Sequence, residues 1–64
     1  MRFKHFSEIK MGNCFVLADS VKEAVSRGTG LDLLIKIATD EAVDRYIGSI
    51  LKIDPTCEIV SVSF

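Results

Sequence analysis

The sequence predicts one α/β (α+β) domain, a two-layer sandwich with two helices on one face of a small three- or four-stranded sheet. Three observations carry this prediction. The chain has 64 residues, which suffices for a single domain spanning residues 1–64. Of these residues 48% are hydrophobic and 27% charged, a composition typical of a packed core rather than of disorder. Segments with strand-like and helix-like apolar spacing follow one another in the order β-β-α-β-α-β.

The first two segments predict a β-hairpin. Residues 2–9 mix aromatic and polar side chains in rough alternation, as an exposed strand does. Residues 14–18 form a short apolar run that is typical of a buried strand. Between them, Gly12 and Asn13 supply residues that accept the backbone conformations of a tight turn.

The third segment predicts a short helix. Ser20 and Glu23 have the spacing of a capping box, in which each side chain satisfies a free backbone N–H of the first turn. Gly28 is expected to end the helix in the left-handed conformation. A single apolar stripe is formed by Val21, Ala24 and Val25.

Residues 31–39 fit either a strand or a helix, and we favour the strand. As a strand, the segment has four apolar residues at two-residue spacing, Leu31, Leu33, Ile35 and Ile37, which would face the helices. Leu34 would then point to the opposite face of the sheet. As a helix, Leu31, Leu34, Ile35 and Ala38 would line up instead. The regular alternation, and the signals for a new helix directly after it, favour the strand.

Residues 41–52 predict the longest helix of the chain. Its apolar residues fall on one half of a helical wheel: Ala42, Val43, Tyr46, Ile47, Ile50 and Leu51. Acidic residues cluster in its first turns and Lys52 closes it, which matches the helix dipole. Gly48 is either a small residue that allows another chain to approach this helix closely or a tolerated defect within it, and we favour the defect. Pro55 ends the helix. Residues 57–64, rich in β-branched side chains, predict the last strand.

This order of elements leaves one face of the sheet uncovered. Each strand–helix–strand unit implies a right-handed crossover between parallel strands, so both helices are expected on the same face. If Val60, Val62 and Phe64 face the core, Ile59 joins Leu34 on the open face. An exposed apolar patch on so small a domain marks an interaction surface.

The net charge of −1 argues against a dedicated nucleic-acid binder, although the N-terminus is basic. Residues 1–10 carry Arg2, Lys4 and Lys10 against Glu8 alone. This segment could meet an acidic partner, or serve as a charged strand edge that discourages aggregation. Phe3, Phe6 and Phe15 near these basic residues also suggest an alternative function, stacking on single-stranded nucleic acid.

No arrangement of residues predicts catalysis, a cofactor or a bound metal. His5, Cys14 and Cys57 are the only soft ligands, and they lack the close pairs of a zinc site. No third group orients a Cys14–His5 nucleophile and base. Gly28 and Gly30 follow a helix and precede a strand, the reverse of a phosphate-binding loop. We therefore expect a protein that is not an enzyme.

The apolar segments are too short for a membrane span. The longest apolar-rich stretch, residues 31–38, is interrupted by Asp32 and Lys36. No signal peptide is recognised at the N-terminus. We expect a cytoplasmic protein with both thiols reduced and no membrane partner.

The sequence thus predicts a small non-enzymatic protein-interaction module with a regulatory, inhibitory or antitoxin-like role. It would bind another protein or itself, with a homodimer as a plausible form, and nucleic acid is the less favoured partner. The residues expected to contact the partner lie on the N-terminal hairpin and the open sheet face: Arg2, Lys4, Phe6, Lys10, Phe15, Leu34 and Ile59.

Overall fold

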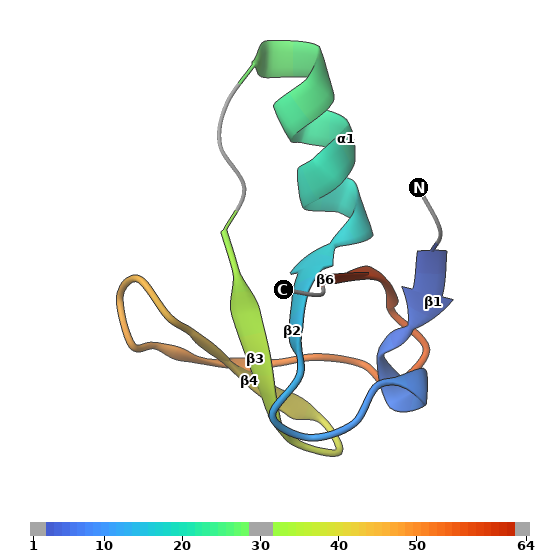
Figure 1. Ribbon diagram of the computed structural model, residues 1–64, viewed down its shortest axis with the longest axis vertical. Coiled ribbons are helices and arrows are strands. Elements are labelled where there is room, and N and C mark those ends of the chain that lie inside the picture. Colours follow the sequence, from blue (N-terminus) through green and yellow to red (C-terminus); the bar gives the residue numbers. More distant parts are fainter. Residues whose placement is uncertain (1–2, 29–31, 63–64) are drawn as a thin grey trace.

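The computed structural model describes residues 3–28 and 32–62, which form a six-stranded antiparallel sheet and one α-helix (Figure 1). The strands lie in the order β1-β6-β2-β3-β4-β5 across the sheet. Their bounds are β1 (Phe3–His5), β2 (Cys14–Leu17), β3 (Leu34–Ala38), β4 (Glu41–Asp44), β5 (Ile50–Lys52) and β6 (Glu58–Val62). The α-helix is α1 (Ala18–Arg27), and a 3-10 turn, η1 (Phe6–Glu8), follows β1.

The predicted helix over residues 41–52 is wrong, because this segment is the β4–β5 hairpin. One carboxylate oxygen of Asp44 accepts hydrogen bonds from the backbone N–H groups of Tyr46 and Ile47. Gly48 adopts a φ of 74°, in the left-handed region that favours glycine. An Asp that opens a turn and a Gly that closes it therefore outweigh the helical apolar spacing. Gly48 is a turn residue and not a defect in a helix.

Loss of that helix overturns the predicted two-layer sandwich with two helices, although the α+β class stands. All the strand pairs of the described residues are antiparallel, so the expected parallel crossovers are absent there. The predicted N-terminal hairpin is also wrong, since β6 lies between β1 and β2. After β1 the chain turns into η1, where the Phe6 N–H donates to Cys57 O at 2.9 Å, and this turn directs it away from β2.

Residues 34–38 form a strand, as we favoured, but its two faces are the reverse of the prediction. Leu34 and Lys36 are buried, whereas Ile37 is exposed. The inward position of Lys36 is possible because its ammonium finds hydrogen-bond acceptors inside the protein, a compensation that the apolar pattern does not reveal. In β6 the faces are reversed too, with Ile59 fully buried and Val60 half-buried. Leu31 and Phe64 lie outside the described residues.

The face that was expected to be open is the core of the protein. Its members come from η1, four strands and two connecting segments: Phe6, Ile9, Phe15, Leu34, Ala42, Ile53 and Ile59. The segment between β5 and β6 leads from one edge of the sheet to the strand next to the other edge, and Ile53 of this segment packs in the core. The Phe6 and Phe15 rings pack with their centroids 5.2 Å apart. The chain therefore covers this face with its own segments.

Helix α1 continues directly from β2 and projects beyond the sheet (Figure 1). It begins at Ala18 rather than at Ser20, and its N-cap residue makes no side-chain hydrogen bond. It ends as predicted at Gly28, which has a φ of 69° and donates its N–H to Ala24 O. Only Ala18 and Val21 of the helix are buried, so its outer turns are largely surrounded by solvent.

Candidate functional site

The structure does not bring the predicted partner-binding residues together on one surface. Four of them are buried in the core: Phe6, Phe15, Leu34 and Ile59. Lys4 and Lys10 are exposed, and Arg2 lies outside the described residues. The expected contact surface of the N-terminal hairpin and open sheet face is therefore not formed as predicted.

The aromatic platform expected for nucleic acid also lacks most of its rings. Phe6 and Phe15 face the core, so neither ring is free to stack on a base. Phe3 is partly exposed and has the ammonium of Lys22 at 5.9 Å from its ring centroid. No observation on the described residues favours nucleic-acid binding over protein binding.

The most exposed group of large apolar side chains lies instead on the turn of the β4–β5 hairpin, the hairpin tip (residues 45–50). Tyr46 is 91% exposed, Ile47 66% and Ile50 61%. The apolar spacing of the sequence placed these three residues on the buried side of a helix. The turn signal that would have identified them is Asp44 followed four residues later by Gly48.

The hairpin tip is held in one conformation by a buried carboxylate. Asp44 is buried, and its Oδ1 accepts from Tyr46 N–H at 2.8 Å and from Ile47 N–H at 3.4 Å. The Asp44 N–H donates to Ser49 O at 2.9 Å, and the Gly48 N–H donates to Asp44 O at 2.7 Å. A buried carboxylate is costly unless it is hydrogen-bonded, so these contacts disfavour other conformations of the turn.

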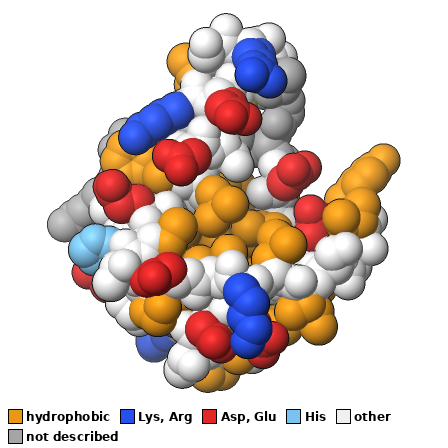
Figure 2. All heavy atoms as spheres, turned by 180° about the vertical axis from the view of Figure 1, so that it is seen from behind, with side chains coloured by type: hydrophobic (Ala, Val, Ile, Leu, Met, Phe, Trp, Pro, Cys, Tyr) orange, Lys and Arg blue, Asp and Glu red, His pale blue; other side chains and the backbone are white. Residues whose placement is uncertain are grey.

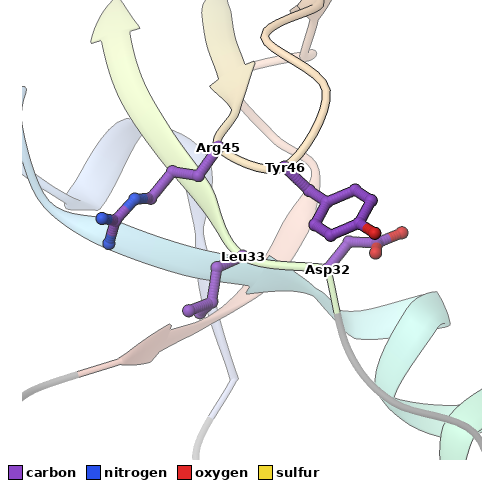
Figure 3. Close-up of a pocket in the computed structure, with 4 residues that line it drawn as sticks. All are labelled: Asp32, Leu33, Arg45 and Tyr46. Carbon is purple, nitrogen blue, oxygen red and sulfur yellow. The ribbon is translucent and has the colours of Figure 1, made fainter.

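A shallow hollow adjoins the hairpin tip, with a volume of about 340 Å³. Its lining residues are Asp32, Leu33, Arg45 and Tyr46. Figure 3 shows the side chains of Tyr46 and Asp32 on one side of it, with those of Arg45 and Leu33 directed the other way. The Arg45 N–H donates to Leu33 O at 3.4 Å, which ties the turn to the residues before β3. The hollow thus offers a carboxylate, a guanidinium and a phenol beside apolar surface.

The free edge of β5 presents unpaired backbone groups. Hydrogen bonds from Asp44 N to Ser49 O and from Ile53 N to Asp40 O flank the pairing of Ala42 with Leu51. Because hydrogen-bonded pairs alternate along an antiparallel ladder, Leu51 directs its N–H and C=O toward β4. The N–H and C=O groups of Ile50 and Lys52 therefore point outward, where the described residues provide no further strand.

The one charged side chain of β5 is neutralised within the hairpin. Lys52 Nζ lies 3.4 Å from a carboxylate oxygen of Asp40 and 3.5 Å from one of Glu41. The charge of Asp40, followed by that of Glu41, raises the pKa of Lys52 above its ordinary value. The ammonium is thus occupied by its own neighbours rather than extended past the strand edge.

At the opposite edge of the sheet, one outward backbone donor of β1 is already satisfied within the chain. The Glu8 carboxylate accepts from the His5 N–H at 2.7 Å. Lys36 Nζ donates to Phe6 O at 3.0 Å and to Ile9 O at 2.9 Å, and lies 4.6 Å from the centroid of the Phe6 ring. This buried lysine of β3 therefore holds η1, the turn that follows β1 in the chain, against the core.

The two cysteines lie in β2 and in the segment before β6. Both are free thiols and half-buried. Burial, followed by the charges of Asp19, Asp54 and Glu58, raises the pKa of Cys57, which lowers the fraction of reactive thiolate. Among the described residues, no three His, Cys, Asp or Glu side chains gather in a way that could hold a metal ion.

No protein-family model, curated protein or solved structure matches this chain. Over residues 3–28 and 32–62, the structure contains no helix long and apolar enough to cross a membrane.

Seen from the side opposite to Figure 1, apolar side chains gather in the middle of the surface below the helix, with carboxylates around them (Figure 2). Because no similar protein indicates a function, the hairpin tip and the β5 edge are the features from which a function can be inferred.

Proposed function

We propose that this chain is a non-catalytic protein-interaction module whose contact surface is the hairpin tip. The observation that carries the proposal is the exposure of Tyr46, Ile47 and Ile50 on a turn that is fixed by the buried Asp44 carboxylate. The role is regulatory, inhibitory or antitoxin-like, and it is exercised in the cytoplasm, where free thiols stay reduced.

The kinds of residue at the hairpin tip support protein binding. Tyr and Arg are enriched among the residues that dominate binding energy at interfaces, and Tyr46 and Arg45 are neighbours here. Burial of a large aliphatic or aromatic side chain contributes roughly 1.5–3 kcal/mol. Because Tyr46 and Ile47 are exposed in the monomer, most of that free energy is still available to a partner.

The rigidity of the tip adds to this argument. A loop that becomes ordered only on binding loses conformational entropy at that step, which reduces affinity. The turn at residues 45–49 is already fixed by hydrogen bonds to Asp44.

A capture experiment with matched variants tests this function. Tagged wild-type protein, a Tyr46→Ser/Ile47→Ser double variant and a Val25→Ser control are used to capture proteins from lysate of the native cell, followed by mass spectrometry. Val25 is 80% exposed on α1, away from the hairpin tip, so its replacement matches the loss of apolar surface.

We expect a protein that the wild type and the Val25→Ser variant retain and that the double variant retains about tenfold less, a change of about 1.4 kcal/mol in binding. Thermal unfolding of all three checks that the fold is kept. Equal capture by the double variant and the wild type, or no specific capture by the wild type, would overturn the proposal.

A further inference from the structure

We propose that the free edge of β5 pairs with β5 of a second copy of this chain, antiparallel and with Leu51 opposite Leu51. The inference deepens the proposed function, because β5 adjoins the hairpin tip, but it is carried by the strand edge rather than by Tyr46 and Ile47. It names one occupant for the open edge: another molecule of the same protein, related by a two-fold axis.

The backbone groups of the edge are self-complementary. Ile50 and Lys52 each direct one N–H and one C=O outward, as the ladder between β4 and β5 requires. In the proposed register Ile50 faces Lys52 of the second copy, and Lys52 faces its Ile50. Each of these two pairs exchanges two hydrogen bonds, so every outward donor and acceptor of the strand is satisfied.

Both neighbouring registers are less favourable. A shift by two residues in one direction would place Lys52 opposite Lys52, and like charges directly opposite one another are destabilising. The opposite shift would place Lys52 opposite Gly48, which lies outside β5 and has a φ of 74°, so fewer residues could pair. The proposed register instead places the ammonium of Lys52 opposite the exposed Ile50, on the face where Lys52 already meets Glu41. Leu51, also exposed, meets Leu51 on the other face.

The same register brings Ile50, the last residue of the hairpin tip, into the contact. Ile50 is 61% exposed and lies opposite Lys52 of the second copy, so the pairing buries apolar surface at the strand edge.

A lysine on an edge strand ordinarily discourages pairing between sheets. Here Asp40 and Glu41 form ion pairs with Lys52, which weakens the repulsion between its charge and a second copy. The β1 edge is less suited to such pairing, because the outward N–H of His5 already donates to the Glu8 carboxylate.

A proline substitution tests the pairing directly. Lys52→Pro removes an outward N–H and leaves the bonds of Leu51 to β4, whereas Lys52→Ala removes the charge but keeps the N–H. Sedimentation of both variants and the wild type is measured from about 10 µM to about 1 mM, because self-association depends on concentration. We expect the wild type and Lys52→Ala to rise from the 7.1 kDa monomer toward twice that mass. Lys52→Pro should associate at least about tenfold more weakly.

A cysteine substitution keeps the test decisive if the proline variant unfolds. With Cys14 and Cys57 both changed to serine, Leu51→Cys should form a disulfide-linked dimer on mild oxidation, because directly opposed residues lie about 4.5–5.5 Å apart between Cβ atoms. Val25→Cys in the same background is the exposed control.

A wild type that stays monomeric over the whole concentration range, or a Lys52→Pro variant that folds and associates like the wild type, would overturn the inference. So would cross-linking of Leu51→Cys no faster than that of Val25→Cys. A monomer that still captures another protein through Tyr46 and Ile47 would refute the pairing and leave the proposed function standing. A dimer without such capture would refute the proposed function alone.

Discussion

The two edges of the sheet are equally short but differ in how their outward backbone groups are used. At β1 the outward N–H of His5 donates to the Glu8 carboxylate, and the chain turns directly into η1. At β5 the outward groups of Ile50 and Lys52 have no partner strand among the described residues. Folded proteins generally protect sheet edges, because an unprotected edge pairs with other chains. The difference indicates that the outward N–H and C=O groups of β5 are free to pair with another strand.

Two buried charged groups maintain this difference. Lys36, 5% exposed, pulls the carbonyls of Phe6 and Ile9 inward and holds η1 over the core. Asp44 holds the turn at residues 45–49 so that Tyr46 and Ile47 face solvent. Lys36 thus fixes η1 over the core, and Asp44 fixes the turn that leaves Tyr46 and Ile47 exposed.

The largest expected effect is a loss of stability in the Lys36→Met variant, which lacks the hydrogen bonds that hold η1 over the core. Each of two buried carbonyls loses a hydrogen bond to a charged donor, and such bonds contribute about 1.5–3 kcal/mol. Burial of the apolar methionine side chain offsets part of this loss, so we expect the free energy of unfolding to fall by about 2–3 kcal/mol. Denaturant unfolding measures this change. Amide exchange at Phe6, which donates to Cys57 O, should also become faster.

The matched control for this variant is Lys10→Met, at an exposed lysine close to η1 in the sequence. Surface substitutions of this kind usually change stability by less than about 0.5 kcal/mol. Equal stability of Lys36→Met and Lys10→Met would contradict the role of Lys36 in closing the β1 side.

A smaller effect is expected on the open side from Gly48→Ala. A Cβ at Gly48 would meet no atom within 4 Å, so only its φ of 74° opposes the change. This strain costs about 1–2 kcal/mol for a residue other than glycine. Ser49→Ala is the exposed control, and thermal or denaturant unfolding compares them. If Gly48→Ala proved as stable as Ser49→Ala, the turn would not be held in the conformation described.

The sequence predicted those elements whose signals are local. The end of α1 at Gly28 and the strands at residues 14–17, 34–38 and 58–62 follow from glycine chemistry and short apolar runs. The direction of the faces could not be predicted, because the position of Lys36 depends on carbonyls of Phe6 and Ile9, which lie 30 and 27 residues away in the chain.

The candidate site was missed for a related reason. The apolar spacing from Ala42 to Leu51 fits a helix as well as a hairpin, and the choice between them is made by a turn and by pairing with β3. Asp44 and Gly48 are the local signal for that turn, and they were interpreted as helix residues. The basic N-terminal residues were chosen for their charge, although Phe6, which lies between Lys4 and Lys10, is needed for the core.

Amide hydrogen exchange measured residue by residue, at low and at high protein concentration, tests the central contrast most directly. At low concentration we expect the amides of Ile50 and Lys52 to exchange rapidly, whereas those of His5 and Leu51 are protected. At high concentration protection should rise at Ile50 and Lys52 and stay unchanged at His5. Slow exchange at Ile50 and Lys52 in the dilute protein, or exchange rates there that do not change with concentration, would contradict an open β5 edge that pairs with β5 of a second copy.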